Sequence, residues 1–456
     1  MSKELVFKAL RHEMVDSVPW VPFTGVHAGK LKGYSAEEML HSADKIVESL
    51  EEVSKLYMPD GMPVLFDLQL EAEILGCELR WAKDNPPSVT THPLEEEAYI
   101  PCDCRIPGPD DGRIPIALEA TSRIKESVGD KVAIYGLICG PFTLAAHLRG
   151  TNLFMDMIKN KEYAQELIAY CGKVSCRMAE MYIDAGADVI AVVDPMISQV
   201  SPKMIKKLMS ETFTGVFDFI RSKGVYSSFF VCGNATAQIR CMCEMGPDGV
   251  SVDENVNIVE AKKICDEFNI AIGGNIPLTT TMLFGNQQDN MKCVVNECDS
   301  LDWTKNFIMS PGCDMPYDTP FENTIACAQA TKNLESTRKM IADYESVGFS
   351  DIHVDIPDYE HADKVIVELF LLDPEQCAAC TYMLASCVDN FDAVQDKAEY
   401  REYRYNRAED IARTMKMGLK NLPTMCIDGE PKFISLIPNR EEFIEAVNAA
   451  AAKKGL

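Results

Sequence analysis

Cysteine is the residue type whose spacing in this sequence most clearly predicts chemistry. Cys377 and Cys380 form a Cys-Ala-Ala-Cys motif that follows an apolar run and opens a helical pattern. A thiol at the start of a helix lies near the positive end of the helix dipole, which favours the thiolate, and the second cysteine lies one turn away. The pair is therefore predicted to form a reversible disulfide, with a structural metal site as the alternative.

The 18 cysteines of this 456-residue chain do not by themselves predict a disulfide framework. Disulfides persist in oxidising compartments, and the opening MSKELVFKALRHEMVD reads as an amphipathic helix and not as a signal peptide. No stretch approaches the roughly 18 uncharged apolar residues of a membrane span. We therefore expect a cytoplasmic protein that does not span a membrane, in which most cysteines are small buried residues.

The composition limits the partners. The net charge is −26, and binding a nucleic-acid backbone needs clustered basic residues, so no nucleic acid is expected. Hydrophobic residues make up 47% of the chain, which is enough for a buried core. A small molecule or another protein is the expected partner, and the oligomeric state stays open, a homo-oligomer included.

Short apolar runs alternate with longer helical patterns over most of the chain, which is typical of a parallel sheet covered by helices. The predicted strands are 19–23, 62–68, 131–138, 188–194, 226–232, 249–253, 270–276 and 306–311. Polar residues follow these runs, as they do at the catalytic face of a barrel. No Gly-x-Gly-x-x-Gly turn opens the first unit, which favours a (β/α)₈ TIM barrel over an open doubly wound sheet.

The length predicts two domains. The α/β barrel is expected over residues 1–345 and ends with a helix over 322–345, and a linker is expected over 346–363. The rest of the chain, 364–456, follows the order strand, helix with the cysteine pair, strand, helix, hairpin, helix. A second, smaller α/β domain is therefore predicted.

Several segments of the first domain resemble the uroporphyrinogen decarboxylase superfamily, and in particular its corrinoid-linked methyltransferase branch, which includes the methylcobamide:coenzyme M methyltransferases. They are VDSVPWVPF (15–23), FDLQLEAEILGCEL (66–79), YGLICGPFTLAAHLRG (135–150), DAGADVIAVVDP (184–195), VCGNATAQI (231–239), GVSVDENVNI (249–258) and SPGCDMPYDTPFENTIA (310–326). The resemblance implies methyl transfer between a corrinoid and a small-molecule donor or acceptor. No corrinoid-binding Asp-x-His-x-x-Gly segment occurs here, so a separate corrinoid protein is the implied partner.

The resemblance also implies a zinc site. In that branch a His-x-Cys-Gly segment and a Ser-Pro-Gly-Cys segment hold zinc, which activates a thiol. This chain keeps Cys232 in FVCG and Cys313 in SPGC, but Phe230 stands in the place of the histidine. Catalytic zinc usually has three protein ligands, so a substitute is expected at the same face. The candidate substitutes at this face are His27, Glu71 or Glu73, Asp194, and Asp253 or Glu254, of which His27, Asp253 and Glu254 are favoured. A site without metal is the alternative.

Five residues with other expected roles complete the site. Asp67 and Asp194 lie at the ends of predicted strands and Glu71 follows one, and these three are the expected catalytic carboxylates. Asn234 and Asn275 are the expected cofactor-binding amides.

Two other functions stay open. A true uroporphyrinogen decarboxylase holds its carboxylate-rich substrate with an arginine-bearing segment after the first strand. The corresponding TGVHAGKLKGYS (24–35) contains two lysines and no arginine, which weighs against decarboxylation. A non-catalytic thiol redox sensor or scaffold is the other alternative, because Phe230 cannot bind metal.

The second domain resembles thioredoxin-like folds. These folds carry a cis-proline opposite a Cys-x-x-Cys pair, and Pro423, in Asn421-Leu-Pro-Thr-Met, lies at the matching place before the hairpin. The resemblance implies a redox module over 364–456, with Cys377, Cys380 and Pro423 as its redox residues.

Overall fold

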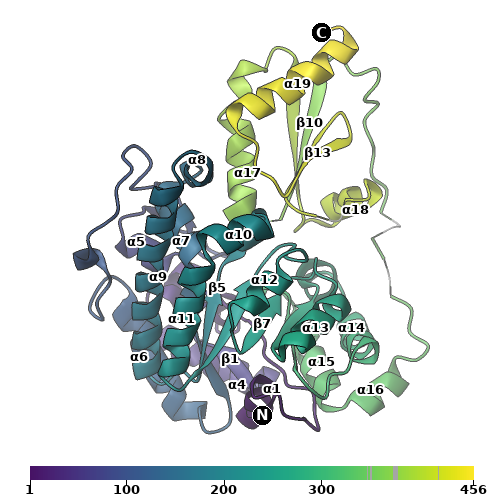
Figure 1. The fold of residues 1–456 in the computed structure, drawn as a ribbon. Helices are drawn as coiled ribbons and strands as arrows, with labels where there is room; N and C mark the ends of the chain where they lie inside the picture. The colour runs from purple at the N-terminus through teal and green to yellow at the C-terminus, as the bar shows by residue number, and fades with distance from the viewer. Residues whose placement is uncertain (347, 350–351, 373–377, 420) are drawn as a thin grey trace. The chain divides into compact units, whose positions relative to one another are not determined.

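The chain divides into two units, Met1–Glu345 and Ser346–Leu456 (Figure 1). The structure is a computed structural model, and it describes residues 1–346, 348–349, 352–372, 378–419 and 421–456. Among these residues, no helix has both the length and the apolar character needed to cross a membrane. Each unit is described by itself below.

The first unit contains a seven-stranded parallel sheet whose strand order follows the sequence. Its strands are β1 (Gly61–Pro63), β4 (Ala133–Cys139), β5 (Val189–Val193), β6 (Tyr226–Val231), β7 (Gly249–Val252), β8 (Ala271–Ile276) and β9 (Phe307–Pro311). All five residues of β5 are apolar and buried, as expected for a strand covered on both faces. The order and type of these strands were predicted from the sequence.

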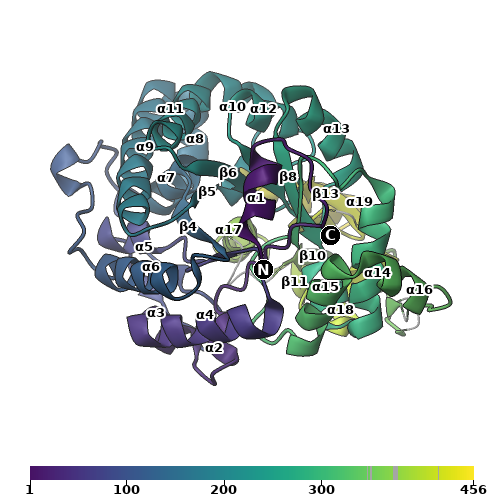
Figure 2. The same ribbon diagram turned by 90° about the horizontal axis from the view of Figure 1, so that it is seen from below.

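The predicted first strand, 19–23, joins the two edges of this sheet. The Val21 N–H donates to the Met309 carbonyl on β9 at 3.0 Å, and the Asp60 N–H donates to the Trp20 carbonyl at 2.8 Å, directly before β1. The segment therefore closes the sheet into a ring that matches a TIM-barrel-like domain. Seen from below, the helices surround the strands (Figure 2).

Helices connect the strands of the first unit. They are α1 (Lys3–Leu10), α2 (His27–Lys30), α3 (Ala36–Leu40), α4 (Ala43–Tyr57), α5 (Leu70–Ile74), α6 (Ile114–Val128), α7 (Pro141–Arg149), α8 (Asn152–Lys159), α9 (Lys161–Asp184), α10 (Pro202–Leu208), α11 (Ser210–Ser222), α12 (Ile239–Glu244), α13 (Ile258–Phe268), α14 (Gln287–Ser300), α15 (Phe321–Lys332) and α16 (Leu334–Met340). Short pieces complete the unit: η1 (Asp103–Arg105), η2 (Pro195–Gln199), η3 (Leu278–Leu283) and the small hairpin of β2 (Leu79–Arg80) and β3 (Ser88–Val89). Val6, Ala9 and Leu10 of α1 belong to the same buried cluster as the strand residues inside the barrel.

The single helix predicted over 322–345 is two helices, α15 and α16. Asn333 separates them with φ −132° and ψ 46°, which is not a helical conformation. The Asn333 side-chain amide donates to the Gln329 carbonyl at 3.2 Å and so competes for a backbone acceptor of α15. The Asn333 carbonyl accepts from the Thr337 hydroxyl at 3.0 Å at the start of α16.

The second unit has a four-stranded sheet in the order β11-β10-β12-β13. Its elements are β10 (Val365–Leu371), α17 (Ala378–Val388), η5 (Phe391–Ala393), β11 (Ala398–Arg404), α18 (Ala408–Lys416), β12 (Thr424–Ile427), β13 (Glu430–Ile434) and α19 (Arg440–Lys454). β10 is parallel to β11 and antiparallel to β12, which is antiparallel to β13. The element order is the one predicted.

Part of the predicted linker packs on the second unit. The Tyr359 hydroxyl donates to Glu368 on β10 at 2.6 Å, and Lys416 donates to the Val354 carbonyl at 2.8 Å. The segment is therefore held in place by hydrogen bonds to the sheet and to α18.

Candidate active site

Cys232 and Cys313 meet at the carboxyl end of the barrel. Cys232 follows β6 and Cys313 follows β9, and both pack against the barrel core. Their sulfurs are bonded to each other in the structure, with the Cα atoms 6.1 Å apart. Residues 81 positions apart in the sequence thus form one bonded sulfur pair, where the family resemblance implied two zinc ligands.

Phe230 turns into the barrel and does not join this pair. Its ring lies 4.8 Å from that of Phe23 and 5.8 Å from that of Phe66, measured between centroids. The three aromatic side chains are buried and fill the barrel below the cysteines. The position at which the resemblance to the methyltransferase branch implied a metal-binding histidine therefore contributes to packing in this chain.

Asp253 and Glu254 follow β7 and lie between the two cysteine loops. The Gly233 N–H, next to Cys232, donates to the Asp253 carboxylate. Gly312, next to Cys313, is so close to Glu254 that a Cβ on it would lie 2.7 Å from the Glu254 nitrogen. The Glu254 carboxylate accepts from the Leu278 N–H, and burial raises its pKa to about 8.

Asn275 holds this loop in place. Its side-chain amide donates to the carbonyls of Asp253 and Val256 at 2.9 and 2.7 Å, and its backbone N–H donates to Glu297 at 3.0 Å. The Asn234 carboxamide oxygen accepts from the Thr236 N–H and hydroxyl at 3.1 and 2.6 Å, within its own turn. In the structure these amides hold loops, where the sequence predicted contacts with a cofactor.

His27 does not lie with the sulfurs as a ligand. Its Nδ1 faces the Tyr317 carbonyl at 2.9 Å and its Nε2 faces the Tyr57 hydroxyl at 2.7 Å, so both ring nitrogens are occupied. Burial lowers its pKa to about 4, which keeps the ring neutral. Throughout the described residues, no three His, Cys, Asp or Glu side chains form a group that could hold a metal ion.

Asp67 is paired with an arginine that the sequence did not single out. Arg113 donates to Asp67 at 2.6 Å and to Glu73 at 2.8 Å, and its guanidinium is almost entirely buried. Arg113 precedes α6 at the end of a long loop, where no strand pattern indicated a site residue. The barrel mouth therefore has an arginine, but from another segment than the one a decarboxylase uses.

Two carboxyl groups near this pair keep an oxygen without a described hydrogen-bond partner. Glu71 accepts from the Cys139 N–H at 2.9 Å through Oε1, while Oε2 is buried and unpartnered. Burial raises the Glu71 pKa to about 7. Asp314 Oδ1 is also unpartnered, and burial with the nearby Asp67 charge raises the Asp314 pKa well above its usual range. Asp314 lies directly over Gly25, where a Cβ would be 1.8 Å from Oδ1.

Asp194 is saturated with hydrogen bonds. It accepts from the Phe142 N–H at 2.8 Å and from the Thr143 hydroxyl at 2.6 Å, at the start of α7. Burial raises its pKa to about 7. The predicted catalytic aspartate thus binds the N-terminus of a helix, and its oxygens are committed to the fold.

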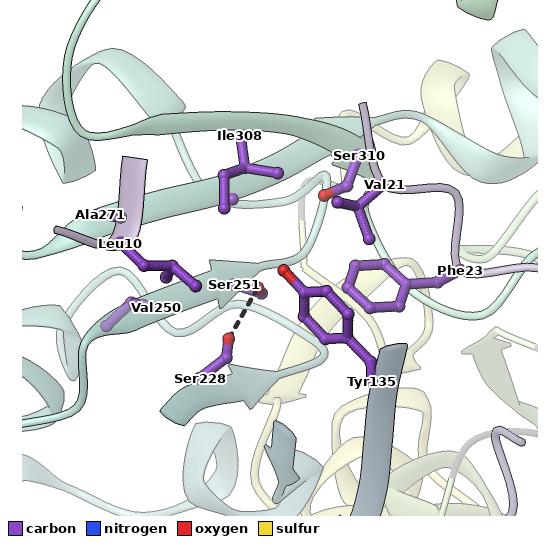
Figure 3. A pocket seen from close by; sticks show the side chains of 12 residues that line it. Leu10, Val21, Phe23, Tyr135, Ser228, Val250, Ser251, Ala271, Ile308 and Ser310 are labelled. Atoms are coloured by element: carbon purple, nitrogen blue, oxygen red, sulfur yellow. Dashed lines mark hydrogen bonds between the residues drawn. The ribbon is translucent and has the colours of Figure 1, made fainter. Parts of the chain in front are cut away.

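The barrel also encloses a small cavity below the aromatic side chains (Figure 3). Tyr135, Ser228, Ser251 and Ser310 contribute polar groups to it, and the two hydroxyls of Ser228 and Ser251 are 3.2 Å apart. Leu10 of α1 lines its amino-terminal side. Neither Cys232 nor Cys313 is among its lining residues, so the cavity is distinct from the sulfur pair.

Of the predicted redox residues, Cys377 lies outside the described residues. Cys380 is fully buried on α17, and the Leu372 N–H donates to its sulfur at 3.3 Å. The Leu422–Pro423 peptide bond is cis.

The first unit is similar to known proteins in sequence and in fold. The sequence pattern of the uroporphyrinogen decarboxylase (URO-D) family matches residues 1–334. The methylcobamide:CoM methyltransferase MtbA of Methanosarcina acetivorans is 27% identical over 340 residues, which are 73% of this chain and 97% of that protein. MtaA of Methanosarcina barkeri, with the same activity in its name, is 29% identical and covers 72% of this chain and 96% of its own length. A solved methyltransferase from Methanosarcina mazei superposes with a TM-score of 0.66 at 26% identity, over 73% of this chain and 98% of that one. The chain belongs to the uroporphyrinogen decarboxylase family.

Proposed function

We propose that this chain transfers a methyl group between a corrinoid carried by a separate protein and a small molecule. The relatives that support this are named as methylcobamide:CoM methyltransferases and match almost over their whole length. The observation that carries the proposal is the sulfur pair Cys232 and Cys313 at the barrel mouth, flanked by buried carboxyl groups. A thiol, a tetrahydrofolate or a methoxylated compound would serve as the methyl donor or acceptor.

Transfer of a methyl group to a thiol releases the thiol proton, so a group at the mouth must accept it. Glu71 has a buried, unpartnered oxygen and a pKa raised to about 7, which is the range in which a carboxylate takes up a proton at neutral pH. Asp67 and Arg113 neutralise each other beside it. We assign proton transfer to Glu71 and positioning to the Asp67 and Arg113 pair.

Zinc fits this site only in part. The sulfurs of Cys232 and Cys313 are bonded to each other in the structure, so this bond must be reduced before the two thiolates could hold the ion. Zinc bound there would keep a thiol deprotonated. The two positions are close enough for both sulfurs to contact one ion, but two ligands are fewer than the usual three, and His27 is engaged elsewhere. No step of the reaction is therefore assigned to zinc, and metal binding by the two cysteines stays a proposal.

Metal content tests that proposal directly. Protein that is reduced and then purified without oxygen should contain about one Zn²⁺ per chain by the usual site stoichiometry, and Cys232→Ala or Cys313→Ala should remove it. Phe230→His restores the family segment and should raise the affinity for Zn²⁺. Equal metal content in wild type and both alanine variants would reject the site.

The methyltransferase activity is tested with methylcobalamin and a series of small acceptors. We expect the corrinoid absorption spectrum to change when a suitable acceptor is present, and Cys232→Ala to abolish the change. Uroporphyrinogen III should remain intact. Formation of coproporphyrinogen would instead assign the chain to the decarboxylases of the family.

We further propose that the second unit is a thioredoxin-like redox module. Its strand order, with a central β10 between β11 and β12, supports this proposal. Redox titration with glutathione, followed by alkylation and mass spectrometry of the peptide around Cys377 and Cys380, measures the potential of the pair. A pair that stays reduced at all potentials would contradict the proposal.

A further inference from the structure

A second pair of thiols lies on the surface of the first unit, far along the chain from the mouth cysteines. Cys102 and Cys104 flank Asp103 on the turn η1, within the long loop before α6. The Cys104 N–H donates to the Cys102 sulfur at 3.2 Å, and the two thiols are hydrogen-bonded to each other. Both residues are exposed, whereas the other free cysteines of the described chain are buried or half-buried.

The contacts make the two sulfurs chemically different. Cys102 accepts hydrogen bonds from the Cys104 thiol and N–H, which lowers its pKa. Cys104 donates to Cys102, which raises its own pKa. Most buried cysteines, such as Cys171, have their pKa raised by desolvation. Cys102 is therefore an accessible thiol with a stabilised thiolate, and Cys104 is a second thiol in contact with it.

A metal ion finds no third ligand at this pair. The Asp103 carboxylate between the two cysteines turns to Lys173 on α9, with both oxygens 2.9 Å from the ammonium nitrogen. Within the part of the chain that the structure describes, no third Cys, His, Asp or Glu completes a metal-binding group there. The arrangement favours chemistry between the two sulfurs, because Cys104 already contacts the Cys102 sulfur through its N–H.

We propose that Cys102 and Cys104 form a thiol–disulfide exchange site for small disulfides. The Cys102 thiolate attacks one sulfur of the disulfide, a new S–S bond forms as the old one breaks, and the leaving thiolate takes the proton that Cys102 lost. Cys104 then attacks the Cys102 sulfur, and the second thiolate leaves with the Cys104 proton. One disulfide is reduced to two thiols, and the cysteine pair is oxidised to one disulfide. This chemistry is independent of methyl transfer.

The test uses the reduced full-length chain and a dipyridyl disulfide, whose released pyridinethione absorbs light. In the fast phase, each wild-type chain should release two more thiones than a chain of the Cys102→Ser/Cys104→Ser double variant. Cys104→Ser should release one fewer than wild type and keep a mixed disulfide on Cys102. Cys102→Ser should lower the rate of this phase by about tenfold or more, because the thiolate that the Cys104 N–H stabilises is the one on Cys102, which this variant lacks. Peptide mass spectrometry assigns each product, and Lys173→Met, which leaves both sulfurs, is the matched control.

Three results would overturn the proposal. The peptide containing Cys102 and Cys104 could stay unmodified through the fast phase. Cys104→Ser could still release two thiones, which would place the second thiol elsewhere. Cys102→Ser could react as fast as Cys104→Ser, which would remove the distinction between attacking and resolving thiol.

Discussion

Arg413 in the second unit and Arg113 in the barrel are both buried against carboxylates, but their surroundings are completed to different degrees. Arg413 donates to Glu368 and to the Tyr359 hydroxyl, and that hydroxyl donates to the other Glu368 oxygen. These three groups form a ring in which both carboxylate oxygens are satisfied. Arg113 donates to Asp67 and Glu73, while its Nη2 has no described partner.

This difference indicates that the Arg413 ring is structural and that the surroundings of Arg113, the open network, belong to a binding site. Around Arg113, the unpartnered atoms include Glu71 Oε2 and Asp314 Oδ1 as well as the guanidinium nitrogen, whereas of the Arg413 ring only Nε lacks a partner in the described structure. A buried polar atom without a partner costs stability. Several such atoms around the Asp67 and Arg113 pair are accounted for if a substrate binds them, and the ring in the second unit needs no ligand.

The largest expected effect is a loss of stability when the closed ring of Arg413, Glu368 and Tyr359 is broken. Arg413→Met leaves Glu368 buried and uncompensated, and such a loss costs about 3–5 kcal/mol. Urea unfolding, with hydrogen exchange read separately over 352–372 and over the barrel strands, should locate the loss in the second unit. The double variant Arg413→Met/Glu368→Leu should recover much of it. A loss under about 1 kcal/mol would show that the ring contributes little.

Replacing Arg113 in the open network should lower the activity more than the stability. Arg113→Met frees Asp67, and misplacing a positioning group at a reacting centre lowers the rate by about a hundredfold. Methyl transfer from methylcobalamin measures this. Arg123→Met is the matched control, because Arg123 pairs with Asp44 and Glu119 on the surface of the same unit. Equal rates in both variants would place Arg113 outside the site.

Much of the fold follows from local pattern. The apolar runs marked the strands within a few residues, because strands covered on both faces have few polar positions. The division of α15 from α16 was missed, because Asn333 is tolerated inside helical patterns and its effect depends on its own backbone bonds.

The site could be predicted less completely than the fold. The strand ends brought Cys232 and Cys313 together, as the family resemblance implied. Which nitrogen, oxygen or sulfur remains available depends on tertiary contacts that no spacing shows. His27 is occupied by Tyr57 and Tyr317, whose positions 30 and 290 residues away carry no sequence signal. Asp314 was not predicted as a site residue although it follows Cys313, because its close approach to Gly25 depends on the tertiary fold.

That approach gives a prediction with a built-in control. Gly25 and Gly33 both have positive φ, 41° and 78°, but a Cβ at Gly25 would overlap Asp314, while a Cβ at Gly33 would meet nothing within 4 Å. Gly25→Ala should therefore reduce the free energy of unfolding by about 1–3 kcal/mol more than Gly33→Ala does. Chemical denaturation measures the difference. Equal losses would mean that only backbone strain matters at both positions.

The smallest expected effect concerns the pH dependence of the open network. The Glu71 pKa is raised by burial to about 7, above its usual value of 4.5, so the folded protein binds a proton that the unfolded chain has released between these values. The contribution of Glu71 to stability is therefore greatest at low pH and declines as the pH rises from about 4.5 to about 7.

The rate has the opposite dependence, because only the ionised Glu71 can accept the thiol proton. Below the pKa the ionised fraction falls tenfold per pH unit, so methyl transfer to a thiol should rise about tenfold from pH 6 to pH 8. Glu71→Gln keeps an acceptor for the Cys139 N–H, and it should remove both the inflection of the rate near pH 7 and the decline in stability. Because the acceptor thiol also ionises with pH, the comparison is the ratio of wild-type to variant rate at each pH. A ratio that is constant across this range would reject Glu71 as the proton acceptor, while the stability profile would still report its burial.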